Sequence, residues 1–110
     1  MMNKGEIWLV DFPSRRGREQ TGKRPSIIVA DTATDLVLVV PLTSNLQALE
    51  KLPYTIQINK SKENKLDKNS VALVLQLQTL DKKRLIAKIG DLEKNDLTKI
   101  NELLRELLQL

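Results

Sequence analysis

Residues 24–43 read RPSIIVADTATDLVLVVPLT, in which two apolar runs flank a short polar turn. The runs, residues 26–30 and 36–40, are rich in β-branched residues, and the polar residues between them are typical of a turn. The pattern predicts two buried strands that pair as an antiparallel hairpin. Because the first strand starts at Arg24 and the second ends just before Thr43, the hairpin should place these two residues at the same end of a sheet.

The sequence on either side continues the β-rich pattern. Residues 5–12 are expected to form a strand that Pro13 ends, and residues 93–109 have the spacing of an amphipathic helix. Further strands are predicted at residues 54–59, 71–79 and 85–92. Since no β-α-β alternation is present, we expect a mainly β fold, namely a small antiparallel, barrel-like sheet with a C-terminal α-helix packed against it.

Three elements carry predictions about individual side chains. In the strand at residues 54–59, alternation should turn Tyr54, Ile56 and Ile58 inward. In the single strand expected at residues 71–79, Gln76 and Gln78 should share one face. The helix should bury one stripe of apolar residues, which comprises Leu97, Ile100, Leu103, Leu104, Leu107 and Leu108.

Length and composition narrow the class of protein. A chain of 110 residues is expected to form one domain, residues 1–110. No apolar run is long enough for a membrane span, and no signal peptide is recognisable, so a cytoplasmic location is expected. The absence of cysteine and histidine excludes thiol chemistry and the usual general base. Neither a cofactor nor a metal site is predicted.

The positive charge is concentrated in one segment. Residues 15–24 hold five cations, among them Arg18 and Lys23, and one acid, Glu19, a net charge of 5 − 1 = +4. The whole chain is also +4, so the remaining residues sum to zero. This concentration predicts a local site for an anion. The lysine-rich residues 60–69 also hold acids and are expected to be a solvated loop.

Several side chains have the chemistry that a phosphate site requires. Arg24 offers a planar, permanently charged fork of donors, and the hydroxyls of Thr43 and Ser44 would lie beside it. The amides of Gln76 and Gln78 have the donors and acceptors that read base edges. Two plainer interpretations remain open. In the first, Arg24 forms only a surface ion pair. In the second, the hydroxyls of Thr43 and Ser44 cap their own turn.

Four ordered blocks resemble the MazF/PemK toxin endoribonucleases. They are GEIWLVDF (residues 5–12), GREQTGKRP (17–25), VVPLTS (39–44) and QLQTLDKKRL (76–85). The resemblance implies an SH3-like barrel of the CcdB/PemK toxin type that works as a homodimer. It implies a sequence-specific, metal-independent endoribonuclease that cleaves single-stranded RNA. It also implies a cognate antitoxin protein whose acidic segment covers the basic loop.

The resemblance assigns roles to individual residues. The family's catalytic arginine and threonine fall on Arg24 and Thr43, and Glu19, Gln20 and Gln76 match positions near the RNA. Glu19 is the candidate proton acceptor, because it is the only carboxylate of the basic loop. An arginine cannot serve, because its pKa is above about 12 and it is already protonated at neutral pH.

The chain also departs from the family pattern. Leu73 and Leu75 stand where some members have an Arg/Asp catalytic pair, and Gln78 stands where members often have arginine. The cleavage sequence therefore cannot be carried over.

Two other functions compete with RNA cleavage. One is a CcdB-like poison of DNA gyrase, against which the absence of a tryptophan near the C-terminus argues. The other is a non-catalytic SH3-like module that binds RNA, although three aromatic residues are few for base stacking. A purely structural subunit would leave the concentrated charge without a purpose.

Overall fold

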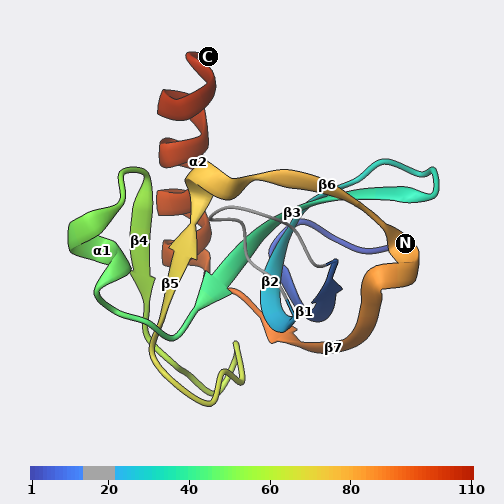
Figure 1. The fold of residues 1–110 in the computed structure, drawn as a ribbon, viewed down its shortest axis with the longest axis horizontal. Coiled ribbons are helices and arrows are strands. Elements are labelled where there is room, and N and C mark those ends of the chain that lie inside the picture. The colour runs from blue at the N-terminus through green and yellow to red at the C-terminus, as the bar shows by residue number, and fades with distance from the viewer. Residues whose placement is uncertain (14–21) are drawn as a thin grey trace.

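Seven strands follow one another along the described residues, with short helical segments between some of them, and a longer C-terminal helix comes last (Figure 1). The computed structural model describes residues 1–13 and 22–110. Its strands are β1 (Glu6–Phe12), β2 (Gly22–Asp31), β3 (Leu36–Thr43), β4 (Thr55–Ile58), β5 (Ser70–Leu73), β6 (Gln78–Asp81) and β7 (Leu85–Asp91). The α-helices are α1 (Ala48–Lys51) and α2 (Lys94–Leu108), and the 3₁₀ turns are η1 (Val74–Gln76) and η2 (Lys82–Arg84).

The predicted hairpin is the centre of the sheet. β2 and β3 pair antiparallel, with Ser26 opposite Pro41 and Ile27 opposite Val40. The strand order is β4-β5-β3-β2-β1-β7, and β6 pairs with β3 beside this path. Over the described residues β4 and β7 are the two ends of this path, so the sheet is a strongly bent barrel that is not closed. The mainly β fold with a C-terminal helix is confirmed.

The two central strands are buried on both faces because the core has two parts. Ile27 and Val40 belong to the larger cluster, which α2 covers with Ile100 and Leu104. The adjacent residues on the same strands, Ile28 and Val39, point the other way into a second cluster. Each of the two apolar runs therefore supplies both clusters, and this explains why neither run alternates with polar residues.

The helix follows its prediction except at its end. Of the expected stripe, Ile100 and Leu104 are buried, and Leu97, Leu103 and Leu107 pack against the larger cluster. Leu108 is wrongly predicted, since it is 51% exposed. Leu108 is the last residue of α2, and the left-handed backbone of Gln109 (φ 57°) ends the helix directly after it.

Two predictions about strands are wrong. Residues 71–79 do not form one strand, because η1 separates β5 from β6. β3 runs past both, pairing at its start with β6 and at its end with β5, and the chain must turn between these two partners. Tyr54 does not point inward from a strand either. It is 36% exposed with a positive φ of 52°, and β4 begins one residue later.

One buried carboxylate ties the N-terminus to the β2–β3 turn and to η2. Asp31 accepts hydrogen bonds from Met2 N (3.0 Å), Ala33 N (2.9 Å) and Lys82 Nζ (2.6 Å). The bond from Lys82 contributes most to holding the pKa of Asp31 well below its ordinary value. A lowered pKa stabilises the folded state fully above the unfolded pKa of about 4, and this stabilisation is lost progressively as the pH falls from there through the lowered pKa of the folded state.

We therefore expect Asp31→Asn to lower the melting temperature at pH 7 and to have a clearly smaller effect at pH 2, where the stabilisation is being lost. Thermal unfolding of both proteins at the two pH values measures the difference. Asp35→Asn, which removes an exposed carboxylate from the same turn, is the matched control and should change little. An equal loss at pH 7 and pH 2 would contradict the assignment of the effect to ionised Asp31.

Candidate active site

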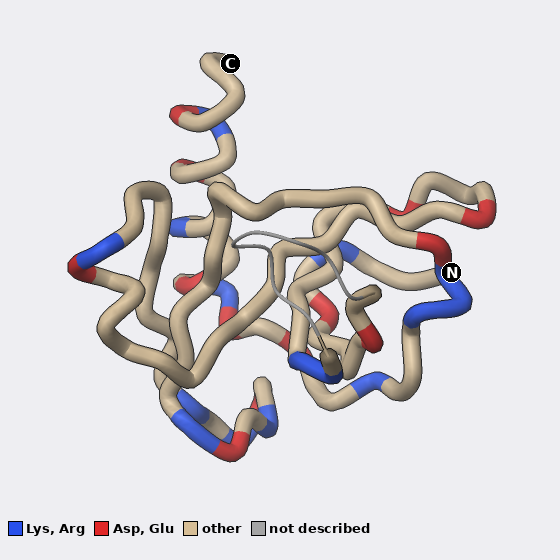
Figure 2. Tube along the Cα trace, in the orientation of Figure 1, with Lys and Arg blue, Asp and Glu red and all other residues tan. Residues whose placement is uncertain are grey.

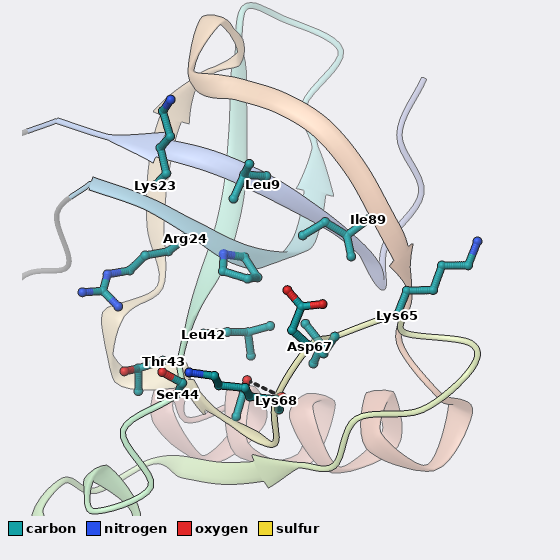
Figure 3. Close-up of a pocket in the computed structure, with 13 residues that line it drawn as sticks. Leu9, Lys23, Arg24, Leu42, Thr43, Ser44, Lys65, Asp67, Lys68 and Ile89 are labelled. Atoms are coloured by element: carbon teal, nitrogen blue, oxygen red, sulfur yellow. Dashed lines mark hydrogen bonds between the residues drawn. The ribbon is translucent and has the colours of Figure 1, made fainter.

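A pocket of about 490 Å³ lies where β2 begins, where β3 ends and where the β4–β5 loop passes (Figure 3). Leu9, Pro25, Leu42 and Ile89 give it an apolar part. Its polar side chains come from all three segments and comprise Lys23, Arg24, Thr43, Ser44, Lys65, Asp67, Lys68 and Ser70. A pocket of this size is within the range that holds a small-molecule ligand.

Arg24 is held by the middle of the sheet. Its backbone lies opposite Val10 of β1, and Pro25, also within β2, follows it directly. Arg24 is half-buried, and in Figure 3 its side chain extends from the strand on the side where Thr43 and Ser44 lie. A guanidinium on such a rigid support is pre-positioned for an anion.

The hairpin brings Arg24 and Thr43 to the same pocket, as the sequence predicts. The pairing of Ser26 with Pro41 sets this arrangement. Arg24 lies two residues before Ser26 and Thr43 lies two residues after Pro41, and in antiparallel strands these two positions are at the same end. Thr43 is further fixed by its pairing with Val71 of β5.

The hydroxyl of Thr43 also has a local role. Its Oγ1 accepts a hydrogen bond from the backbone N–H of Asn45 at 3.2 Å, so the plainer interpretation of a self-capping turn is part of the structure. A hydroxyl that accepts in this way keeps its own proton for donation. Thr43 is buried and Ser44 is exposed, so the turn presents one fixed and one accessible hydroxyl.

The β4–β5 loop is the part of the site that the sequence analysis missed. The side chains of Lys65, Asp67 and Lys68 are exposed as expected, but they also form one wall of the pocket. Leu66 between them is buried in the larger core cluster. Leu66 was the feature of the sequence that could have revealed this wall. A single apolar residue in a polar segment indicates that the loop packs against the sheet.

The described side chains give the pocket a positive charge. Lys23, Arg24, Lys65 and Lys68 oppose one acid, Asp67, so the lining sums to 4 − 1 = +3. Figure 2 shows these cations on two segments, the start of β2 and the β4–β5 loop. Both segments border the same pocket, which is therefore suited to an anionic ligand such as a phosphodiester.

Of the remaining predicted residues, the structure places only Gln76 and Gln78. Arg18, Glu19 and Gln20 fall within residues 14–21, outside the part of the chain that the structure describes. Gln76 is in η1 and Gln78 begins β6 opposite Val39, and neither lines the pocket of Arg24. Gln78 Nε2 donates to the backbone carbonyl of Gln76 at 3.1 Å, so the side chain of Gln78 lies against the backbone of Gln76, and the two residues do not belong to one strand.

Within residues 1–13 and 22–110, no helix has the length and apolar character needed to cross a membrane.

The sequence matches known proteins over most of its length. A family model described as a PemK-like, MazF-like toxin of type II toxin-antitoxin systems matches residues 3–108. The chain is 38% identical over 105 residues to Endoribonuclease MazF of Staphylococcus saprophyticus, which covers 92% of this chain and 86% of the relative. It is 36% identical over 108 residues to Endoribonuclease MazF of Staphylococcus epidermidis, which covers 94% and 88%.

Solved structures have the same fold. MazF from Deinococcus radiodurans superimposes with a TM-score of 0.81 at 22% identity, covering 99% of this chain and 97% of that chain. An endoribonuclease in complex with its cognate antitoxin, from a mycobacterial species, gives a TM-score of 0.76 at 22% identity, covering 100% and 97%. At this level of identity the likeness extends to the fold.

Proposed function

The chain belongs to the family of PemK-like, MazF-like toxins of type II toxin–antitoxin systems, and from this we propose that it is an endoribonuclease that cleaves single-stranded RNA. The observation that carries the proposal is the position of Arg24 and Thr43 in one cationic pocket. Relatives named Endoribonuclease MazF at 36% and 38% identity support it. The reaction needs no metal ion, and RNA sequence selects the site of cleavage.

RNA carries its own nucleophile, and the pocket has the groups that its attack requires. The 2′-hydroxyl attacks the adjacent phosphorus, the bond from phosphorus to the 5′-oxygen breaks, and a 2′,3′-cyclic phosphate and a 5′-hydroxyl result. Arg24 stabilises the negative charge that develops on the phosphoryl oxygens. Thr43 donates a hydrogen bond from its hydroxyl to the phosphate and holds the in-line geometry. Glu19 accepts the proton of the 2′-hydroxyl, and the departing 5′-oxygen takes up a proton from the solvent to become the 5′-hydroxyl.

Other side chains bind the RNA around this centre. Arg18, Lys23 and Ser44 contact its phosphates, whereas Gln20, Gln76 and Gln78 contact bases. In Figure 3 the ammonium group of Lys68 lies on the same side as Thr43 and Ser44, where it adds a further positive charge for the phosphate. The binding of RNA should weaken with added salt, because phosphate contacts release counterions.

The partners follow from the family and from the charge of the pocket. The active form is a homodimer in the cytoplasm, and a cognate antitoxin inhibits it with an acidic segment. A disordered acidic segment that folds onto the +3 pocket would cover Arg24 and exclude RNA.

The chemistry of the cleaved ends tests the proposed function. We expect the purified chain to cut a long single-stranded RNA at a limited set of sequences in the presence of excess EDTA. The products should carry 2′,3′-cyclic phosphate and 5′-hydroxyl ends, because the attacking oxygen belongs to the substrate. Mapping of both ends across the RNA measures the outcome. Ends with a 3′-hydroxyl, or activity that EDTA abolishes and magnesium restores, would contradict the proposal.

A further inference from the structure

Asp67 is the single described acid of an otherwise cationic pocket. Four described cations border the same pocket, yet within the described residues the carboxylate of Asp67 forms no hydrogen bond or ion pair with any of them. The acceptor capacity of Asp67 is therefore available to a ligand.

The side chain points into the pocket. Figure 3 shows the carboxylate of Asp67 directed to the side where Ile89 and Leu9 lie, whereas the ammonium groups of Lys23 and Lys65 point away from it. Thr43 and Ser44 lie on the other side of the view. The pocket thus has two parts, one with the hydroxyls and Arg24, and one in which a carboxylate stands among apolar side chains.

The loop that carries Asp67 is fixed from within by Asn64. This side chain is fully buried, and its Oδ1 accepts hydrogen bonds from the backbone N–H groups of Ser61 (2.9 Å) and Leu66 (3.0 Å). Its Nδ2 donates to the carbonyl of Asn59 at 2.9 Å. A buried amide with three hydrogen bonds holds the whole turn in one conformation.

The same loop is also fixed to the sheet. Asp91 N donates to the carbonyl of Glu63 at 3.0 Å, and the side chain of Leu66 is buried in the larger core cluster. Asn69 Oδ1 accepts from Lys60 N at 3.0 Å and closes the neck of the loop. Asp67 therefore presents its carboxylate from a rigid support, as a group that distinguishes between ligands must.

We propose that Asp67 reads one base of the RNA next to the scissile phosphate and selects a base with an exocyclic amino group over uracil. This inference rests on the proposed function. In a single strand the Watson–Crick edge of each base is free for contact. A carboxylate only accepts hydrogen bonds, so it favours the amino groups of adenine, cytosine and guanine. Guanine is the best ligand, since two adjacent N–H groups pair with both oxygens.

Uracil is excluded at the same position by its carbonyl groups. Its one ring N–H is flanked by two carbonyl oxygens, which a carboxylate repels. The apolar side chains of Leu9 and Ile89 provide a surface for the face of the base. A base in this part of the pocket belongs to a nucleotide whose phosphate can reach Arg24 and Thr43 in the other part.

Exchange of the carboxylate for an amide tests the inference. The cleavage sites of the wild type and of Asp67→Asn are mapped on one long RNA under single-turnover conditions. In the wild type, one position beside the cut should favour amino bases over uracil by roughly 5- to 150-fold, the range of a well-formed contact to a base edge. In Asp67→Asn this preference should fall several-fold or more at that position, because an amide also donates to the carbonyls of uracil. The other positions should keep theirs.

Glu63→Gln is the matched control. It removes one negative charge from the same loop but lies outside the pocket, so it should keep the wild-type preferences. A binding assay with 2′-deoxy oligonucleotides that differ only at this base provides a measurement independent of cleavage. The affinities of the wild type for these oligonucleotides should rank in the same order as its cleavage preference. In Asp67→Asn the affinities should become nearly equal.

The possible results separate this inference from the function on which it rests. If the wild type does not cut RNA, the proposed function fails. If it cuts RNA and Asp67→Asn keeps every preference, the role of Asp67 alone is overturned. A loss of cleavage by more than about a hundredfold at all sequences would also overturn it, since such a loss indicates proton transfer rather than base selection.

Discussion

Replacing Arg24 by alanine is expected to lower the rate of RNA cleavage at least about 10²- to 10³-fold while the protein remains folded. A pre-positioned donor that stabilises charge in a transition state is typically worth this factor. The fold should survive because Arg24 lies near the start of β2, is only half-buried and belongs to no core cluster. Single-turnover cleavage of one RNA, with circular dichroism of the same samples, measures both quantities.

Two further variants distinguish the role of the guanidinium from that of charge alone. Arg24→Lys keeps the charge but not the planar fork of donors, so most of the loss should persist. Lys23→Ala removes a neighbouring, exposed charge and should weaken RNA binding far more than it slows the chemical step. An Arg24→Ala protein that cleaves within about threefold of the wild-type rate would contradict the assignment.

The second large effect is expected from Gly90→Ala, which adds a methyl group to β7 against the β4–β5 loop. A Cβ at this position would lie 2.5 Å from the carbonyl oxygen of Asn64 and 2.7 Å from that of Glu63. These are backbone atoms of a loop that the side chain of Asn64 fixes from within, so they cannot move aside cheaply. Overpacking of this kind costs typically about 1–3 kcal/mol.

We therefore expect Gly90→Ala to lower the melting temperature by several degrees and to reduce cleavage, because displacement of Asn64 also displaces Asp67. Thermal unfolding and the cleavage assay measure the two effects. Ala87→Ser, a small change at an exposed residue of the same strand, should leave both unchanged. If Gly90→Ala melts within one degree of the wild type, the loop yields more easily than its hydrogen bonds indicate.

The sequence predicted those features that depend on neighbours in the chain. The apolar runs around residues 31–35 define the β2–β3 hairpin, and the hairpin alone brings Arg24 and Thr43 together. The stripe from Leu97 to Leu107 likewise follows from helical spacing. In both elements the pattern of apolar residues matches the period of the structure that buries them.

The features that were missed depend on distant partners. The break at η1 occurs within a run of strand-forming residues, and it follows from the two partners of β3 rather than from residues 74–76 themselves. Asp67 reaches the pocket because Leu66 packs in the core and because Gly90 leaves room for Asn64. Nothing local distinguishes this acid from the other charged residues of the loop.

The role of each site residue stays a prediction. Gln76 and Gln78 lie outside the pocket of Arg24, so contact with them requires RNA that extends beyond it. Arg18, Glu19 and Gln20 lie in residues 14–21, outside the described ranges.

The pairing of β1 with β7 makes the fold depend on contacts between residues that are far apart in the sequence. Ile7 lies opposite Gly90, and Ile100 and Leu104 belong to the same core cluster as Ile7, so β1 gains its second partner strand and its full core only when residues 85–104 are present. A nascent chain that ends after β3 already contains Arg24 and Thr43 but lacks the wall and the helix that complete their frame. The pocket around Arg24 can therefore form only after the residues of β7 and α2 have been synthesised.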